Sequence, residues 1–281
     1  MAFSDRITAH SYSTHSLHSS LTTAMSTRSE RISRAFEEIK RAVDGDQDKR
    51  ERLIKASRDI TAQSKRLIFS LHRVYKQPRV QQFEELRSIR ENQLSSIHEI
   101  WFSRVAVEFD YRDDIERCLT MDTFSKFVYG GLEEYIEAVS FLEFLESDRL
   151  ITIDKLHNML TKEEDDKHVI QIRPLEYLGG LADLTGELMR MAIQLLGMAD
   201  LSQIERIVEL ITSVRHILQD SIPRFHSHSL QQKLRTLENS LVKIEDTRYM
   251  YEVRRAEFRD NPQALKRVME HYSSDGTRHS D

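Results

Sequence analysis

The fold is decided by residues 123–146, which read TFSKFVYGGLEEYIEAVSFLEFLE. The apolar spacing in this stretch predicts a helix from Thr123 to Glu146. The helix is apolar on almost every side, so it needs neighbours on all of its faces. We therefore place it at the centre of a helical bundle.

The segments on both sides of this stretch also carry helical periodicity. We predict further helices at residues 29–75, 80–109, 152–160, 174–196, 201–222 and 230–258. Residues 111–122 read as a polar break, residues 161–168 as a charged loop, and Pro223 as the separator of the last two helices. Only 8 Gly and 4 Pro are present, and 31% of the residues are charged, which is typical of long amphipathic helices. The predicted fold is an all-α bundle of six to seven helices.

Composition predicts three regions: a disordered tail at 1–28, one helical domain at 29–260 and a flexible tail at 261–281. The first region is rich in Ser, Thr and His and lacks the apolar core of a secretory signal; a mitochondrial presequence is the alternative. No apolar run approaches the roughly 20 residues that span a bilayer, so we expect no membrane contact. The single cysteine, Cys118, excludes an internal disulfide. A reducing compartment is the default, so we expect the cytoplasm, with the nucleus as a second location.

Two glutamates interrupt the apolar surface of the central helix. At about 100° per residue, Phe127, Glu134 and Phe141 fall on one strip, with Glu137 beside it. An ionised carboxylate is costly to bury without a partner. These two side chains therefore need a cation, a hydrogen-bond network or an open cavity.

The helix at 174–196 repeats this arrangement. Gly179 and Gly180 are followed by Asp183 and, one turn later, by Glu187, with Arg190 on the same side. The central helix likewise carries two adjacent glycines just before its two glutamates. Missing side chains at such positions let another group approach closely.

If the two helices face each other, four carboxylates converge on one oxygen-rich site: Glu134, Glu137, Asp183 and Glu187. Hard oxygen ligands favour Mg²⁺, with Mn²⁺ as a second choice. Such ions can activate water and stabilise the charge that builds up when a phosphodiester is cleaved. The alternative is that these are ordinary exposed helix residues or partners of Lys and Arg, as most Glu-x-x-Glu pairs are. Spacing alone does not decide between the two.

The helix at 29–75 carries a basic stripe. Arg58, Lys65 and His72 lie seven residues apart, with Arg66 and Arg73 alongside them. Because the net charge is −5, nucleic-acid binding would require such a local stripe or a partner protein. The two interpretations of the stripe are phosphate contacts to RNA and a solvated face.

Several segments resemble one branch of a known family. Residues 51–61 (ERLIKASRDIT), 64–66 (SKR), 71–73 (LHR), 131–141 (GLEEYIEAVSF) and 177–190 (YLGGLADLTGELMR) are similar to translin-associated factor X proteins of the translin family. The resemblance runs over residues 36–258. Translin itself lacks the aspartate of the last segment, so the match is to the factor X branch.

The resemblance implies a fold, an activity and a partner. Members of this branch are curved helical bundles that assemble with translin into a hollow, octamer-like hetero-oligomer. That complex is a Mg²⁺-dependent endoribonuclease on single-stranded RNA, such as small-RNA passenger strands or precursor-tRNA fragments, with catalysis in the factor X subunit. The acidic positions of the branch correspond to the four carboxylates above. The alternative is a non-catalytic, nucleic-acid-binding or structural partner that stabilises translin.

Overall fold

The computed structural model describes residues 14–109, 114–162, 167–168, 170–197, 201–259, 261 and 263. The chain divides into two compact units, Met1–Glu51 and Arg52–Asp281. The predicted helical domain began at residue 29, whereas the unit that contains the candidate site begins at Arg52.

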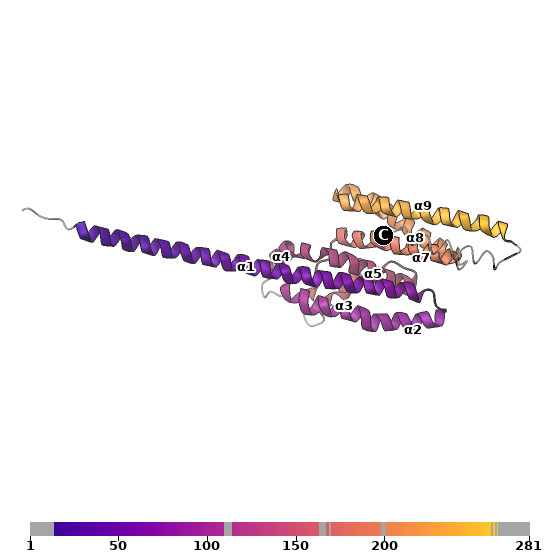
Figure 1. Cartoon of the computed structure of the whole chain (residues 1–281), viewed down its shortest axis with the longest axis horizontal. Coiled ribbons are helices and arrows are strands. Elements are labelled where there is room, and N and C mark those ends of the chain that lie inside the picture. The colour runs from indigo at the N-terminus through magenta and orange to yellow at the C-terminus, as the bar shows by residue number, and fades with distance from the viewer. Residues whose placement is uncertain are drawn as a thin grey trace, which may run out of the picture. The chain divides into compact units, whose positions relative to one another are not determined.

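Helices make up nearly all of the described regular structure, which confirms the all-α prediction (Figure 1). In chain order they are α1 (Thr14–Val74), α2 (Arg79–Ile89), π-helical η1 (Arg90–Leu94), α3 (Ser95–Ile100), π-helical η2 (Trp101–Val105), the 3₁₀ turn η3 (Ala106–Phe109), α4 (Asp114–Phe124), the 3₁₀ turn η4 (Ser125–Phe127), α5 (Tyr129–Ser147), α6 (Ile153–Met159), α7 (Pro174–Gly197), α8 (Leu201–Phe225) and α9 (His228–Glu257). No described helix combines the length and apolar character needed to span a membrane.

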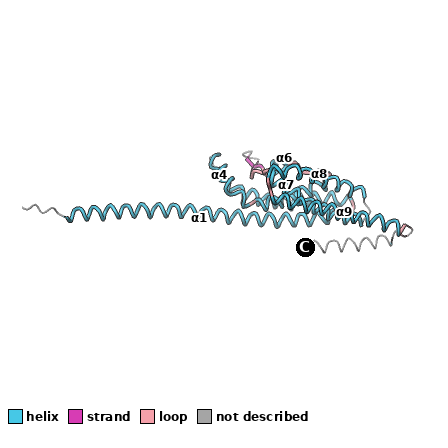
Figure 2. Tube along the Cα trace, turned by 90° about the horizontal axis from the view of Figure 1, so that it is seen from above, coloured by secondary structure: helices cyan, strands magenta, loops and turns pink. Residues whose placement is uncertain are grey.

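The predicted charged loop at 161–168 contains a short antiparallel ladder instead. Strand β1 (Thr161–Lys162) pairs with β2 (Lys167–His168), coloured magenta near α6 in Figure 2. Residues 163–166 between the two strands lie outside the described residues. Just before the ladder, Thr152 caps the start of α6, because its side chain accepts a hydrogen bond from the Lys155 backbone N–H.

Helix α1 begins at Thr14, inside the stretch that composition predicted to be a disordered tail. It also passes through Gly45 without a break. Residues 14–28 contain few apolar side chains, so apolar periodicity could not predict a helix there. Residues 1–13, and most of the predicted tail at 261–281, lie outside the described residues.

Two helix boundaries near the centre of the chain differ from prediction. The central helix α5 begins at Tyr129 rather than Thr123, because Val128 has φ −112° and ψ −4° and leaves regular helical geometry. The predicted polar break at 111–122 is wrong over its described part, which belongs to α4. Apolar residues flank Val128 on both sides, so periodicity could not locate the bend.

Contrary to prediction, Pro223 does not separate the last two helices. It lies in the last turn of α8, which ends at Phe225. The chain reverses at His226, which adopts a left-handed conformation with φ 48°. Proline removes one backbone N–H donor and crowds the carbonyl four residues earlier, and here α8 continues for only two residues beyond it.

The predicted helix at 80–109 is one helical run with two π-helical segments, η1 and η2. Each π turn adds a residue and rotates the apolar stripe. The five-residue step from Ile89 to Leu94 spans the first of them, and both side chains are buried. The irregular turns therefore keep the stripe facing the core.

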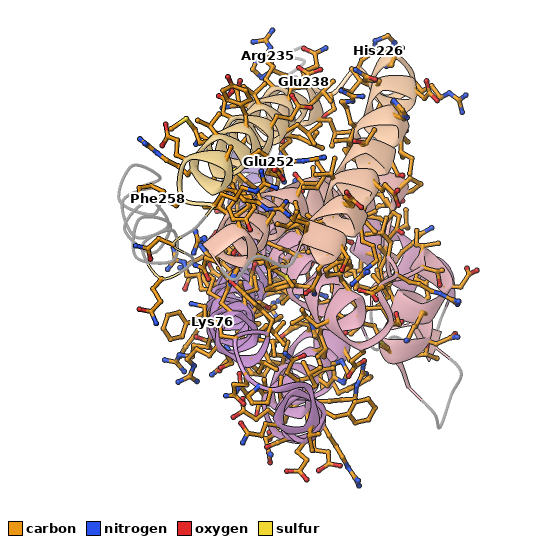
Figure 3. The ribbon with its side chains drawn as sticks, turned by 90° about the vertical axis from the view of Figure 1, so that its right-hand side faces the viewer. Lys76, His226, Arg235, Glu238, Glu252 and Phe258 are labelled. Atoms are coloured by element: carbon orange, nitrogen blue, oxygen red, sulfur yellow. The ribbon has the colours of Figure 1, made fainter. Side chains whose placement is uncertain are left out.

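Helix α5 forms the centre of the second unit, as predicted. Leu132, Tyr135, Ile136, Phe141 and Leu142 are completely buried. Helix α7 packs against α5, α8 and α9. On α9, Arg235 and Glu238 lie on its outer side (Figure 3). The polar residues of α5 and α7 therefore face each other, next to residues of α1 and α9.

Candidate functional site

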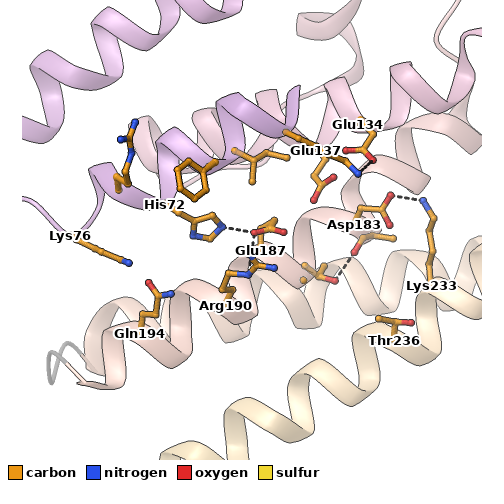
Figure 4. Close-up of a pocket in the computed structure, with 17 residues that line it drawn as sticks. His72, Lys76, Glu134, Glu137, Asp183, Glu187, Arg190, Gln194, Lys233 and Thr236 are labelled. Carbon is orange, nitrogen blue, oxygen red and sulfur yellow. Dashed lines mark hydrogen bonds and ion pairs between the residues drawn. The ribbon is translucent and has the colours of Figure 1, made fainter. Parts of the chain in front are cut away.

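A cavity of about 810 Å³ lies where four helices of the second unit meet (Figure 4). The four predicted carboxylates all line it: Glu134 and Glu137 from α5, and Asp183 and Glu187 from α7. The third wall is α1, and the fourth is α9, which contributes Lys233 and Thr236. The structure therefore brings the predicted acidic residues to one cavity.

Glycines permit the close approach of α5 and α7. A Cβ atom at Gly180 would lie 2.6 Å from Cγ2 of Ile136, and one at Gly179 would lie 2.9 Å from the carboxyl carbon of Glu133. Gly131 instead meets Ser57 of α1, whose hydroxyl accepts a hydrogen bond of 3.1 Å from the Gly131 N–H. The predicted role of adjacent glycines is confirmed at these three positions. Gly130 is different, since nothing lies within 4 Å of a Cβ there.

Glu137 is the most unusual of the four acids. Its side chain is buried, and among the described residues no ion pair or side-chain hydrogen bond involves it. Burial, together with the charges of Asp183, Glu187 and Glu134, raises its pKa to about 9. Without a cation in the cavity, this carboxyl group is therefore protonated at neutral pH.

Each of the other three acids has a cationic or imidazole partner. The Lys65 ammonium lies 3.2 Å from Oε1 of Glu134, and the Lys233 ammonium lies 2.6 Å from Oδ2 of Asp183. Nε2 of His72 is hydrogen-bonded to Oε2 of Glu187 (Figure 4). In this structure, these three acids therefore match the alternative interpretation, in which the carboxylates pair with basic side chains.

The pairing shows in the pKa values. Burial acts to raise the pKa of Glu187, but the hydrogen bond and charge of His72, with the charge of Arg190, lower it below its usual value. Burial acts to lower the pKa of Lys233, but Asp183 and Glu133 raise it above its usual value. Burial raises the pKa of Glu134, and Lys65 only partly offsets this. The cavity therefore contains acids paired with basic side chains beside a protonated Glu137.

The residues fit a divalent cation by their chemistry. Among the described residues no group of three or more His, Cys, Asp or Glu side chains is arranged to hold a metal ion. The donor set nevertheless consists of carboxylate oxygens, which suits Mg²⁺ or Mn²⁺. Glu137 supports the fit, because its buried carboxyl group can ionise beside three other acids when a cation compensates the added charge. The four-carboxylate metal site stays a prediction.

The predicted basic stripe separates into two groups. Lys65 and Arg73 line the cavity, together with Lys76, which was not among the predicted residues. Arg58 and Arg66 are exposed but do not line it. His72, predicted as part of the stripe, is instead buried and hydrogen-bonded to Glu187 of the acidic cluster.

Sequence reasoning missed two contributors to the site. Lys233 lies on α9 and contacts Asp183, which is 50 residues earlier in the chain. Glu133 shares this lysine at 2.7 Å. Glu133 follows Gly131 by two residues and Glu134 follows it by three, so Glu133 could have been suspected. No pattern within α9 distinguishes Lys233 from its other basic residues.

The neutral state of Glu137 predicts how stability depends on pH. Between its unfolded pKa of 4.5 and its folded pKa of about 9, the folded protein holds a proton that the unfolded chain has released. Stability therefore falls as pH rises through this window, by up to about 1.4 kcal/mol per pH unit for this group. Glu137→Gln removes the loss, so we expect its melting temperature in chelator to exceed that of wild type at pH 8 and to approach it near pH 5.

Glu84→Gln is the matched control, because Glu84 is an exposed glutamate on α2. Thermal melts of the three proteins across pH 5–9 provide the measurement. A Glu137→Gln advantage that does not grow with pH would contradict a protonated Glu137.

Comparison with known proteins agrees with this architecture. A sequence model described as Translin family matches residues 48–255. The chain is 34% identical to translin-associated protein X of Rattus norvegicus over 241 residues, 79% of each chain. It is 31% identical to the translin-associated protein X homolog of Schizosaccharomyces pombe over 229 residues, covering 80% of this chain and 90% of that protein.

Solved structures show the same fold. The crystal structure of AfC3PO matches with a TM-score of 0.58 at 20% identity, covering 79% of this chain and 98% of that chain. A second AfC3PO structure, with the same figures, is a complex of that protein with duplex RNA. The sequence model covers most of the chain, and two relatives above 30% identity cover more than three quarters of it. This chain therefore belongs to the translin family.

Proposed function

We propose that the chain is the catalytic subunit of a metal-dependent endoribonuclease that cuts single-stranded RNA in a hetero-oligomer with translin. The observation that carries the proposal is the buried carboxyl group of Glu137, which has no partner among the described residues and shares a cavity with three other acids. A purely structural subunit gains nothing from this arrangement, because it costs free energy in the absence of a cation. Cationic side chains at the same cavity suit a phosphodiester substrate.

In this proposal the side chains have distinct tasks. Glu134, Glu137, Asp183 and Glu187 would hold Mg²⁺ or Mn²⁺. A divalent ion there would supply positive charge that activates water and stabilises the developing charge on the phosphate. Lys65, Arg73 and Lys76 line the same cavity and would hold the RNA phosphates. The hydrogen bond from His72 keeps Glu187 oriented towards the cavity.

Exposed apolar side chains support assembly with a partner. On α1, Ile32, Phe36, Ile39 and Val43 are 48–68% exposed and recur at alternating steps of four and three residues. This spacing is that of a helix that packs against another helix. We propose that translin covers such surfaces in an octamer-like complex, located in the cytoplasm and also in the nucleus.

The decisive experiment is RNA cleavage by the co-expressed complex with and without a chelator. We expect cleavage of a short single-stranded RNA to stop in EDTA and to return when Mg²⁺ or Mn²⁺ is added in excess. A duplex of the same sequence tests the preference for single strands. Cleavage that EDTA does not change would contradict the metal site, and absence of cleavage under all conditions would favour the non-catalytic alternative.

A second experiment concerns RNA binding. In the Lys65→Ala, Arg66→Ala, Arg73→Ala triple variant, binding should weaken for all sequences. The log–log dependence of the binding constant on salt should flatten by up to ~0.7 for each phosphate that the variant no longer binds. The measurement is a salt titration of binding to a short single-stranded RNA.

Arg58→Ala and Arg87→Ala are the controls. Arg58 belongs to the predicted stripe but lies outside the cavity, and Arg87 is exposed on α2 and paired with Glu91. If the cavity holds the RNA, both controls keep the wild-type slope. An unchanged slope in the triple variant would show that the stripe is a solvated face or a contact to translin.

A further inference from the structure

Lys233 is held more firmly than any other described cation at the cavity. Its ammonium nitrogen lies 2.6 Å from Asp183 Oδ2, 2.7 Å from Glu133 Oε2 and 3.1 Å from the carbonyl oxygen of Gly179. An ammonium group has three N–H donors, so these three acceptors satisfy it completely. The side chain is only 20% exposed. Lys233 therefore connects α9 to both helices that carry the acidic cluster.

The other ammonium in contact with an acid of the cluster provides a contrast. Lys65 contacts Glu134 at 3.2 Å, but its side chain is 64% exposed. Solvent screens an exposed pair, so such a contact contributes little. A partly buried pair is screened less, and removing one member leaves the other charge uncompensated. Of these two lysines, Lys233 is thus the one that can compete with an incoming cation.

A divalent ion bound to Oδ2 of Asp183 would lie close to the Lys233 ammonium, which is 2.6 Å from that oxygen. Two positive charges at one carboxylate oxygen repel each other, so the ion and the ammonium compete for it. We propose that Lys233 is a built-in counter-ion of the acidic cluster, which holds Asp183 in the metal-free protein and leaves it when a divalent cation binds. This inference rests on the proposed metal site. Lys233 is accordingly a positioning residue that sets the affinity for the ion, and it is not a metal ligand.

The first test measures metal binding directly. Lys233→Met keeps most of the side-chain length and removes the charge, so Mn²⁺ no longer competes with an ammonium. We expect the Kd for Mn²⁺, measured by calorimetry on the complex with translin, to fall on the order of tenfold. Lys155→Met is the matched control, because Lys155 pairs with Glu143 and does not line the cavity, and its Kd should change less than about twofold. An unchanged or weaker affinity of Lys233→Met would overturn the inference.

The second test uses the wild-type protein, so it does not depend on a variant that folds. A lysine-acylating reagent followed by mass spectrometry reports how accessible each ammonium is. We expect Lys233 to react slowly in EDTA and several-fold faster in saturating Mn²⁺. Lys155, which pairs with Glu143 and does not line the cavity, should react equally in both conditions. Equal protection of Lys233 with and without Mn²⁺ would overturn the inference.

The two tests separate this inference from the proposed function. If the wild-type protein binds Mn²⁺ but Lys233→Met binds it no more tightly, the proposed metal site stands and only the proposed role of Lys233 is wrong. If the wild-type complex is assembled, as judged by light scattering, but binds no Mn²⁺, both the metal site and the role of Lys233 are wrong. Tighter binding by Lys233→Met together with metal-dependent labelling supports both.

Discussion

Asp183→Asn and Glu134→Gln are each expected to lower RNA cleavage by the complex with translin more than roughly 100-fold, because loss of residues that only orient metal ligands already costs 10–100-fold. Each change keeps the shape of the side chain and removes the charge that a hard cation requires. Single-turnover cleavage at saturating Mg²⁺, on RNA in excess of its Kd, measures the chemical step. RNA binding and assembly should survive, because neither depends on the missing charge.

Glu143→Gln is the control for these variants. Glu143 is also on α5, but it pairs with Lys155 at 2.6 Å and does not line the cavity. Its complex should cleave RNA at the wild-type rate. Near wild-type cleavage by both Asp183→Asn and Glu134→Gln would show that the acidic cluster is not a metal site, whatever the family relationship.

Gly180→Ala is expected to destabilise the protein by about 1–3 kcal/mol, the usual cost of overpacking a core. The added methyl group would lie 2.6 Å and 2.7 Å from two carbons of Ile136 and 2.9 Å from the backbone oxygen of Glu133. A backbone atom cannot move aside as a flexible side chain can, so α5 and α7 must separate. Thermal unfolding of the complex in chelator measures the loss, and cleavage should fall as well because the acidic residues move apart.

Gly186→Ala is the matched control on the same helix. Nothing lies within 4 Å of a Cβ there, so alanine should stabilise α7 by roughly 0.5–1 kcal/mol through its higher helix propensity. The melting temperature should therefore be lower than that of wild type for Gly180→Ala and higher for Gly186→Ala. If both raise the melting temperature, the close contact between α5 and α7 does not exist as described.

The acidic face was predictable because it depends on one helix at a time. Glu134 and Glu137 stand out within an apolar stripe, and Asp183 and Glu187 follow two glycines at helical spacing. Helical geometry relates residues three and four apart wherever the helix is placed. The pairing of these acids was not predictable in the same way. His72, taken with the basic stripe, is bonded to Glu187, and Lys233 reaches Asp183 from a different helix.

The sequence by itself determined the all-α class, the central position of α5 and the four acidic candidates, because all of these follow from local periodicity. It misplaced boundaries at Val128 and Pro223, where the chain bends without a change in apolar spacing. Only the tertiary structure decided which cations meet which carboxylates, and it left Glu137 without a partner among the described residues. Those contacts depend on the distances between helices, and Gly179 and Gly180 set the separation of α5 and α7 through atoms that lie far apart in the chain.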